Sequence, residues 1–133
     1  MTRYMLDTNI ISDLIRNPKG KAAKRVADVG NDNVCTSIIV AAELRYGSVK
    51  NGSKRLVQLV EGLLGEIKVL SFETPADVEY GAIRSELESA GKPIGANDLL
   101  IAAHARAVFA TIVTANVGEF ARIRGLKVEN WLA

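Results

Sequence analysis

Apolar residues follow two patterns along this chain. Four short runs are almost continuously apolar, which is typical of strands buried on both faces of a parallel sheet. These predicted strands are Arg3–Leu6, Val34–Thr36, Val69–Phe72 and Thr111–Thr114. Longer segments between them carry apolar residues at helical spacing. The predicted helices are Asn9–Arg16, Lys21–Val29, Val40–Gly47, Lys54–Ile67, Pro75–Ala90 and Asp98–Val108. This alternation of strands and helices predicts an α/β fold.

The helix predicted at Pro75–Ala90 has distinct end signals. Thr74 suits the N-cap, Pro75 suits the first helical position, and Gly91 can end the helix in a left-handed conformation. Residues at helical spacing that we expect to face the core are Val78, Ala82, Ile83, Leu87 and Ala90. Because no linker or internal repeat interrupts the sequence, we expect one domain over residues 1–133.

Four acidic residues stand at the boundaries of the apolar segments. They are Asp7, Glu43, Asp98 and Glu119. A charged group beside a buried segment is costly unless it is paired or bound to a cation. Ligands of open α/β sheets bind outside the carboxyl ends of the strands. Asp7 and the segment Asn116–Glu119 fall at such ends, so the pattern predicts a site for a hard metal ion such as Mg²⁺ or Mn²⁺.

Each acid also has a simpler structural explanation. Asp7 could cap the helix that follows it, and Asp98 could serve the start of its own helix in the same way, with Asn97 as the actual cap. Glu43 could be a solvated helix residue paired with Arg45 or Lys50. Only convergence of the acids in space favours a metal site, because carboxylates clustered without a cation repel one another.

Composition narrows the class of protein. A hydrophobic fraction of 48% and a charged fraction of 24% are typical of a folded globular chain. The single cysteine, Cys35, excludes an internal disulfide and a thiolate zinc site, and it is compatible with a reducing cytoplasm. We expect Cys35 and the lone His104 to be structural. The net charge of +2 permits nucleic-acid binding without requiring it, and no apolar run is long enough to predict a membrane span.

Four sequence blocks occur in a characteristic order. They are Met5–Asn9, Ala42–Gly47, Ile94–Ala103 and Ile112–Asn116. Together they resemble the PIN-domain ribonucleases, and among these the VapC toxins of bacterial toxin–antitoxin pairs. The resemblance runs over nearly the whole chain, to Trp131. It implies a PIN-like three-layer sandwich with a central, mainly parallel sheet flanked by helices.

The resemblance also implies an activity and a set of site residues. The activity is Mg²⁺-dependent cleavage of RNA, most often tRNA, which arrests translation and growth; Mn²⁺ is an expected substitute. Asp7, Glu43 and Asp98 match the acidic metal-binding residues of the family. The fourth position stays open between Asn116, which would support the metal site through hydrogen bonds, and Glu119.

Several neighbouring residues are expected to support or extend this site. Thr8 and Thr114 stand near strand ends, where their hydroxyls can hold carboxylates or satisfy backbone groups. The candidate cations for RNA contact are Arg45, Lys92 and Arg106. Relatives often have a small residue or glycine where this chain has Phe109, so an easy left-handed cap is lost there.

The resemblance implies several partners. They are RNA, a homodimer partner, and an antitoxin that covers the acidic site in a toxin–antitoxin hetero-oligomer. Operator DNA would be contacted only through the antitoxin, and no membrane is involved. The segment Ala41–Tyr46 and the helix Lys54–Ile67 could offer the antitoxin an apolar surface, although core packing explains the leucine pattern of that helix more simply.

Two other functions stay open at this level. A non-catalytic module of the same fold could act with a partner on operator DNA, because Asn116 is neutral where an acid is common. A Mg²⁺-dependent phosphatase or phosphotransfer domain would usually carry a second acid two residues after the first. Asp7-Thr8-Asn9 lacks that acid.

Overall fold

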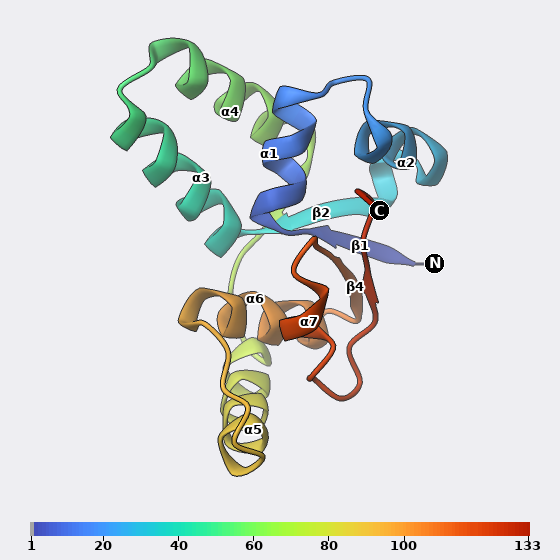
Figure 1. Ribbon diagram of the computed structural model, residues 1–133, viewed down its shortest axis with the longest axis vertical. Coiled ribbons are helices and arrows are strands. Elements are labelled where there is room, and N and C mark those ends of the chain that lie inside the picture. The colour runs from blue at the N-terminus through green and yellow to red at the C-terminus, as the bar shows by residue number, and fades with distance from the viewer. Residues whose placement is uncertain (1) are drawn as a thin grey trace.

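A five-stranded sheet forms the centre of the computed structural model, which describes residues 2–133 (Figure 1). All strands are parallel, in the order β3-β2-β1-β4-β5. Their bounds are Arg3–Leu6 for β1, Val34–Ser37 for β2, Lys68–Leu70 for β3, Ala110–Val113 for β4 and Val128–Glu129 for β5. Strand β1 pairs in parallel with both β2 and β4, so the carboxyl ends of these three strands lie side by side at the same edge of the sheet.

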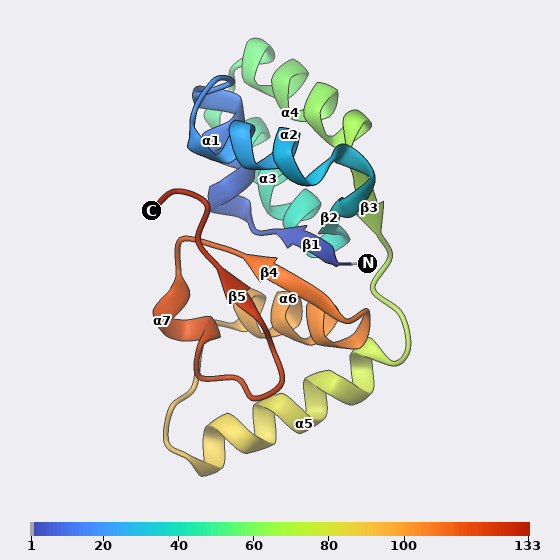
Figure 2. The ribbon, with the colours of Figure 1, turned by 90° about the vertical axis from the view of Figure 1, so that its right-hand side faces the viewer.

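Helices cover both faces of the sheet. Their bounds are Thr8–Arg16 for α1, Lys21–Val29 for α2, Ile38–Asn51 for α3, Lys54–Glu66 for α4, Ala76–Ser89 for α5, Ala96–Ala107 for α6 and Val117–Phe120 for α7. Helices α1 to α4 lie on one side, and α5 to α7 lie on the other (Figures 1 and 2). The predicted α/β sandwich with a central parallel sheet is therefore confirmed.

The core explains why the strand sequences lack a polar face. Every residue of β2 and β4 is buried, and Met5 and Leu6 of β1 have no exposed surface. Helix α6 packs between the sheet and α5, and three of its alanines, Ala102, Ala103 and Ala105, are completely buried. Small side chains allow such a close approach. Among residues 2–133, no helix combines the length and apolarity needed to cross a bilayer.

Helix α3 is longer than predicted, and two short elements lie where the sequence predicts none. Helix α3 starts at Ile38 and not at Val40, because Ser37 caps it and its hydroxyl accepts the Ile39 N–H at 3.1 Å. It continues past Gly47 to Asn51 and stops at Gly52, where φ is +76°. Strand β5 and helix α7 were not predicted, because two and four residues are too few to show a period.

The predicted core face of α5 is partly wrong. Ile83 and Leu87 are buried as expected, but Val78 is 63% exposed and Ala82 and Ala90 are exposed as well. Helix α5 packs on α6 along one side and extends beyond the rest of the molecule (Figure 2). Its buried stripe is therefore narrower than the apolar pattern of the sequence.

The end signals of α5 are confirmed at one end only. Gly91 has a φ of +68°, and the Lys92 N–H returns to the Leu87 carbonyl at 2.9 Å, as in a glycine-terminated helix. The N-cap assignment to Thr74 is wrong, because the helix starts at Ala76. Its N-cap residue is Pro75, which has no side-chain cap.

Phe109, just after α6, has the left-handed φ of +58° and a side chain that is 93% exposed. We expect Phe109→Gly to raise the free energy of unfolding by about 1 kcal/mol, because glycine removes the strain of this backbone conformation. Urea titration measures the change. Phe109→Ala, which removes the ring and keeps the strain, is the control and should change stability little; equal gains in both variants would contradict this explanation.

Candidate functional site

Asp7 is the buried centre of the acidic cluster. It follows β1 directly, caps α1, and is only 3% exposed. Its Oδ1 accepts the Thr8 N–H at 2.7 Å, and its Oδ2 accepts the Thr114 hydroxyl at 2.7 Å and the Asn9 amide at 3.3 Å. Burial raises the pKa of Asp7, and these hydrogen bonds offset the rise in part. The capping role suggested by the sequence and a place in the cluster therefore coexist.

Glu43 and Asp98 reach the cluster from opposite helical layers. Glu43 lies on α3, where its Oε1 accepts the Thr8 hydroxyl at 2.7 Å and its Oε2 accepts the Asn97 amide at 3.1 Å. Asn97 immediately precedes Asp98 in the first turn of α6. The bond between Asn97 and Glu43 thus brings the acid-bearing segments of α3 and α6 together next to Asp7.

Asn116 joins the remaining two acids. It is the N-cap residue of α7, and its Nδ2 donates to Asp98 Oδ2 at 3.1 Å and to Glu119 Oε2 at 2.6 Å. Both candidates for the fourth position therefore lie beside Asp98. An amide nitrogen carries two hydrogens, so a single Asn116 can serve both carboxylates.

Burial and repulsion between the clustered carboxylates change their pKa values. The pKa of Asp98 is raised to about 7, first by partial burial, then by its hydrogen bond with Glu119 and by repulsion from Asp7, Glu119 and Glu43. The pKa of Glu119 is lowered, mainly by the same hydrogen bond with Asp98. The two neighbouring carboxyls therefore differ in acidity, and Asp98 is the weaker acid of the pair. Within residues 2–133, none of the four carboxylates forms an ion pair.

The donor set fits a hard divalent cation. All donors are oxygen atoms, which suits Mg²⁺ or Mn²⁺ and excludes a soft, thiolate-bound metal. In the part of the chain that the structure describes, no three acids lie close enough together to ligate one ion at once. This arrangement fits an ion that keeps several waters and binds one or two carboxylates directly, as Mg²⁺ commonly does.

Asn97 is the residue whose contact the sequence did not indicate. Its position before Asp98 suggested a helix cap, yet the N-cap residue of α6 is Gly95 and the Asn97 amide binds Glu43 instead. Thr8 and Thr114 do hold carboxylates, through hydroxyl hydrogen bonds to Glu43 and Asp7.

Two of the three proposed RNA-facing cations are engaged elsewhere. Arg45 pairs with Glu61 at 2.9 Å, so the alternative that it neutralises Glu43 is wrong. Arg106 pairs with Glu79 at 2.9 Å and ties α6 to α5. Lys92 is exposed, and it makes no ion pair with residues 2–133.

His104 and Cys35 lie away from the acids. His104 is 1% exposed, its Nδ1 is hydrogen-bonded to the Ser37 hydroxyl at 2.7 Å, and its ring meets Phe72 edge-on. Burial lowers the pKa of His104, and the nearby Ser71 carbonyl, which lies outside good hydrogen-bond geometry, offsets this only in part. Burial raises the pKa of the Cys35 thiol to about 11, so this thiol is not reactive.

A groove adjoins the cluster between α1, α3 and α4. Its volume is about 350 Å³. The lining residues are Thr8, Ser12, Ile15, Arg16, Glu43, Leu44, Gly47, Ser48, Leu56 and Val60. Because Thr8 and Glu43 belong to both, a ligand in this groove would lie beside the acids. We call it the α1–α3–α4 groove.

The raised pKa of Asp98 predicts how stability depends on pH. A carboxyl with a raised pKa in the folded chain stabilises the fold fully below its ordinary pKa, and that contribution is lost as pH rises through the folded-state value. In EDTA, we expect the free energy of unfolding to fall between pH 4 and about pH 7. Urea titrations across this range should show a smaller fall for Asp98→Asn; an equal fall would contradict the expectation.

Comparison with known proteins agrees with this geometry. The PIN domain family model matches residues 4–126. The tRNA(fMet)-specific endonuclease VapC of Shigella flexneri is 37% identical over 132 residues, covering 98% of this chain and 99% of that protein. Ribonuclease VapC2 of Rickettsia felis is 41% identical over 130 residues, with coverage of 96% and 97%.

Solved structures give the same result. DNA-bound VapBC from Salmonella typhimurium contains a chain that is 36% identical and superposes with a TM-score of 0.90 over 98% of this chain and 99% of its own length. VapBC2 from Rickettsia felis, bound to a promoter DNA fragment, matches with 38% identity and a TM-score of 0.88, over 98% and 99%. This protein therefore belongs to the PIN-domain family, among the VapC ribonucleases.

Proposed function

We propose that the protein is a Mg²⁺-dependent endoribonuclease and the toxin of a type II toxin–antitoxin pair. The observation that carries the proposal is the cluster itself: a buried Asp7 meets Glu43 and Asp98 at the carboxyl edge of a parallel sheet, without a neutralising ion pair among residues 2–133. Relatives 37% to 41% identical over nearly their full length are named endonuclease or ribonuclease.

The metal would supply the activating charge, and the side chains would fix the geometry. Mg²⁺ held among Asp7, Glu43 and Asp98, by one or two of the carboxylates directly and by the others through its waters, would lower the pKa of a bound water and neutralise charge on the phosphate under attack. Thr114 and the Thr8 N–H fix the two oxygens of Asp7. Thr8 and Asn97 fix the two oxygens of Glu43 in the same way.

Asn116 and Glu119 would have a distinct role from the three metal ligands. Asn116 Nδ2 holds Asp98 and Glu119 side by side, and the pKa of Asp98 is raised while that of Glu119 is lowered. Cation binding at Asp98 favours its ionised form, so the proton would leave the pair when the site fills.

We propose tRNA as the substrate and one PIN domain over residues 1–133. The named specificity of the Shigella flexneri relative for tRNA(fMet) supports this class of substrate. VapBC complexes bound to DNA support an antitoxin partner, through which the complex would contact operator DNA. We also propose that the toxin is a homodimer.

Substitutions of the acids test the catalytic proposal. Asp7→Asn and Asp98→Asn should each lower the rate of tRNA cleavage in MgCl₂ by about 100-fold or more, because each removes a metal ligand. Fragments resolved by gel electrophoresis give the rate. EDTA should stop cleavage by the wild-type protein, and added Mg²⁺ should restore it.

Asp77→Asn is the matched control, because Asp77 is an exposed acid of α5 outside the cluster. Its cleavage rate should equal that of the wild type. Cleavage that persists in EDTA and in both Asp→Asn variants would refute the proposal. Absence of Mg²⁺ and Mn²⁺ binding by calorimetry would favour the non-catalytic alternative.

The α1–α3–α4 groove is the surface that we assign to the antitoxin. Leu44, Leu56 and Val60 give it an apolar lining, and Glu43 connects it with the acids. An amphipathic helix of a partner can bury its apolar face in such a groove. Such an occupant would block access to Glu43 and Thr8, which would neutralise the toxin.

Gly47 offers a way to test this assignment without disturbing the fold. It lines the groove, and a Cβ added at this position would meet no atom within 4 Å. Gly47→Leu should fill the groove and raise the dissociation constant for the product of the adjacent antitoxin reading frame by about tenfold or more, because burial of a leucine-sized volume is worth about 1.5–3 kcal/mol. Co-purification and titration calorimetry measure this loss.

Gly62→Leu on α4 is the control, since Gly62 also has free space around it and lies outside the groove. Both variants replace a glycine within a helix, so both should gain about 0.5–1 kcal/mol of stability. Antitoxin binding that is equally strong in both variants would show that the antitoxin binds elsewhere.

A further inference from the structure

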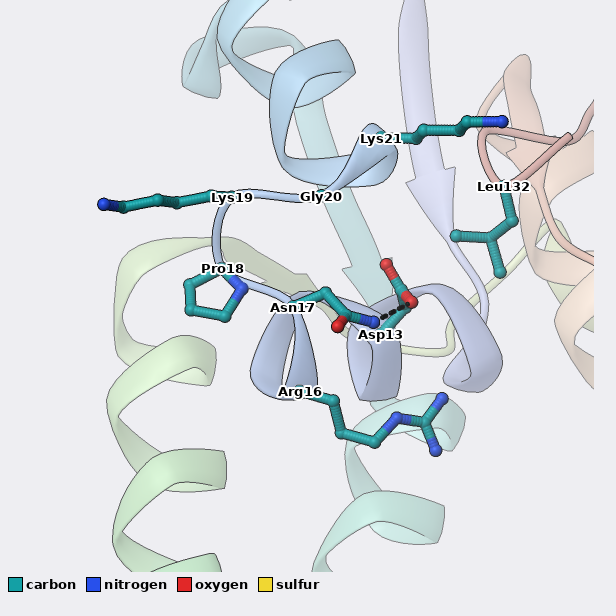
Figure 3. A pocket seen from close by; sticks show the side chains of 8 residues that line it. All are labelled: Asp13, Arg16, Asn17, Pro18, Lys19, Gly20, Lys21 and Leu132. Atoms are coloured by element: carbon teal, nitrogen blue, oxygen red, sulfur yellow. Dashed lines mark hydrogen bonds between the residues drawn. The ribbon is translucent and has the colours of Figure 1, made fainter.

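A positively charged surface lies beyond the acidic site, on the turn between α1 and α2 and along α2. We call it the α1–α2 basic surface, and it comprises Arg16, Lys19, Lys21, Lys24 and Arg25. Two hollows of about 600 and 390 Å³ shape it, and Lys21 lines both. Figure 3 shows the larger hollow, with Leu132 of the C-terminal segment at the right of the view and Lys19 at the left.

This surface concentrates the positive charge of the protein. Counting side chains, the two hollows contain five cations and two acids, Asp13 and Glu129, an excess of three, whereas the side chains of the whole chain sum to +2. Glu129 pairs with Arg25 at 3.2 Å. Asp13 accepts a hydrogen bond from Asn17 at 2.8 Å. The other four cations make no ion pair within the described part of the chain.

Arg16 connects this surface with the acidic site. It lines the larger basic hollow and also the α1–α3–α4 groove, which Thr8 and Glu43 line as well. Helix α1 extends over nine residues from Thr8, next to Asp7, to Arg16, a distance of about 13 Å at the usual helical rise. One strand of a duplex carries a phosphate about every 3.4 Å along its axis. A nucleic acid in the acidic site would therefore reach Arg16 within a few nucleotides.

The shape of the surface fits a polymer better than a single phosphate group. Lys19 and Lys21 extend in opposite directions from the turn, and Asp13 and Asn17 lie between them (Figure 3). Cations spread in this way can contact successive phosphates along a backbone. None of the large apolar side chains that are exposed within residues 2–133 belongs to this surface, which argues against a membrane as the partner.

Bases have no stacking platform on this surface. Trp131 is 3% exposed, because Arg25 covers its ring at 5.3 Å and Tyr4 packs against it at 5.2 Å. The available contacts are therefore ionic, and such contacts bind the backbone without reading its sequence.

We propose that the α1–α2 basic surface binds the phosphate backbone of the RNA segment next to the one that enters the acidic site. This proposal rests on the proposed ribonuclease function. It makes the surface a positioning region, which raises affinity for an extended, folded RNA and takes no part in breaking the phosphodiester.

A charge-matched pair of triple variants tests the proposal. The test variant is Lys19→Gln, Lys21→Gln, Lys24→Gln, and the control variant is Lys50→Gln, Lys54→Gln, Arg55→Gln, which removes three exposed cations near the α3–α4 turn. Binding of fluorescently labelled bulk bacterial tRNA is measured by anisotropy in EDTA at several KCl concentrations. Urea titration verifies that both variants are folded.

The test variant should bind tRNA at least tenfold more weakly than the control variant. Its plot of log affinity against log salt should be shallower by about two, because each lost contact to a single-stranded phosphate removes about 0.7 from the slope. Equal losses in the two triple variants would overturn the proposal, because net charge alone would then explain them. Wild-type binding of a DNA duplex as tight as that of tRNA, with the same loss in the test variant, would assign the surface to DNA.

Cleavage kinetics distinguish this inference from the function on which it rests. In MgCl₂, the test variant should show a KM for tRNA at least tenfold higher, with kcat within twofold of the wild type. A fall in kcat at unchanged KM would overturn the positioning role. Absence of cleavage by the wild-type protein would refute the ribonuclease proposal, while surface-dependent tRNA binding in EDTA would still establish the RNA-binding surface.

Discussion

The hydrogen bond from the Thr114 hydroxyl to Asp7 Oδ2 is the contact on which the site depends. It joins the residues that follow two neighbouring strands, β1 and β4, and it compensates a carboxylate that is almost completely buried. The Asp7 carbonyl also accepts the Ile10 and Ile11 N–H groups, so α1 starts from the same residue. The position of Asp7 thereby determines where Thr8 lies, and Thr8 in turn holds Glu43.

The acids come from three layers that the sequence separates widely. Two contacts hold the layer of α3 against α6: Asn97 binds Glu43, and His104 binds Ser37, the residue that caps α3. His104 thus holds Ser37, the residue from which α3 begins. The Asn97 amide, in the first turn of α6, holds Glu43 of α3. The chemistry of the site is carried by carboxylates, but its geometry is carried by hydroxyl, amide and imidazole groups.

Much of this arrangement could be predicted, and the failures have physical reasons. Continuous apolar runs located four strands because both faces of the sheet are covered, whereas β5 is too short to show a pattern. Motif order indicated Asp7, Glu43 and Asp98, but spacing along the chain contains no information on the contact between Asn97 and Glu43, which are 54 positions apart. The sequence alone does not decide whether Asn116 or Glu119 takes the fourth position of the site. In the structure, both side chains lie beside Asp98. Val78 follows the apolar pattern of α5 but is exposed, because the pattern does not show how narrow the contact between α5 and α6 is.

Arg16 lines both the α1–α3–α4 groove and the larger basic hollow. The antitoxin and the RNA would therefore both contact Arg16. An antitoxin in the groove would compete with the RNA backbone for the Arg16 guanidinium as well as for access to Glu43. Inhibition would then strengthen as the substrate shortens, because an oligonucleotide that ends before Arg16 lacks this contact and competes less well with the antitoxin. The reach of the substrate along α1, as much as the affinity of the inhibitor, would set how completely the toxin is silenced.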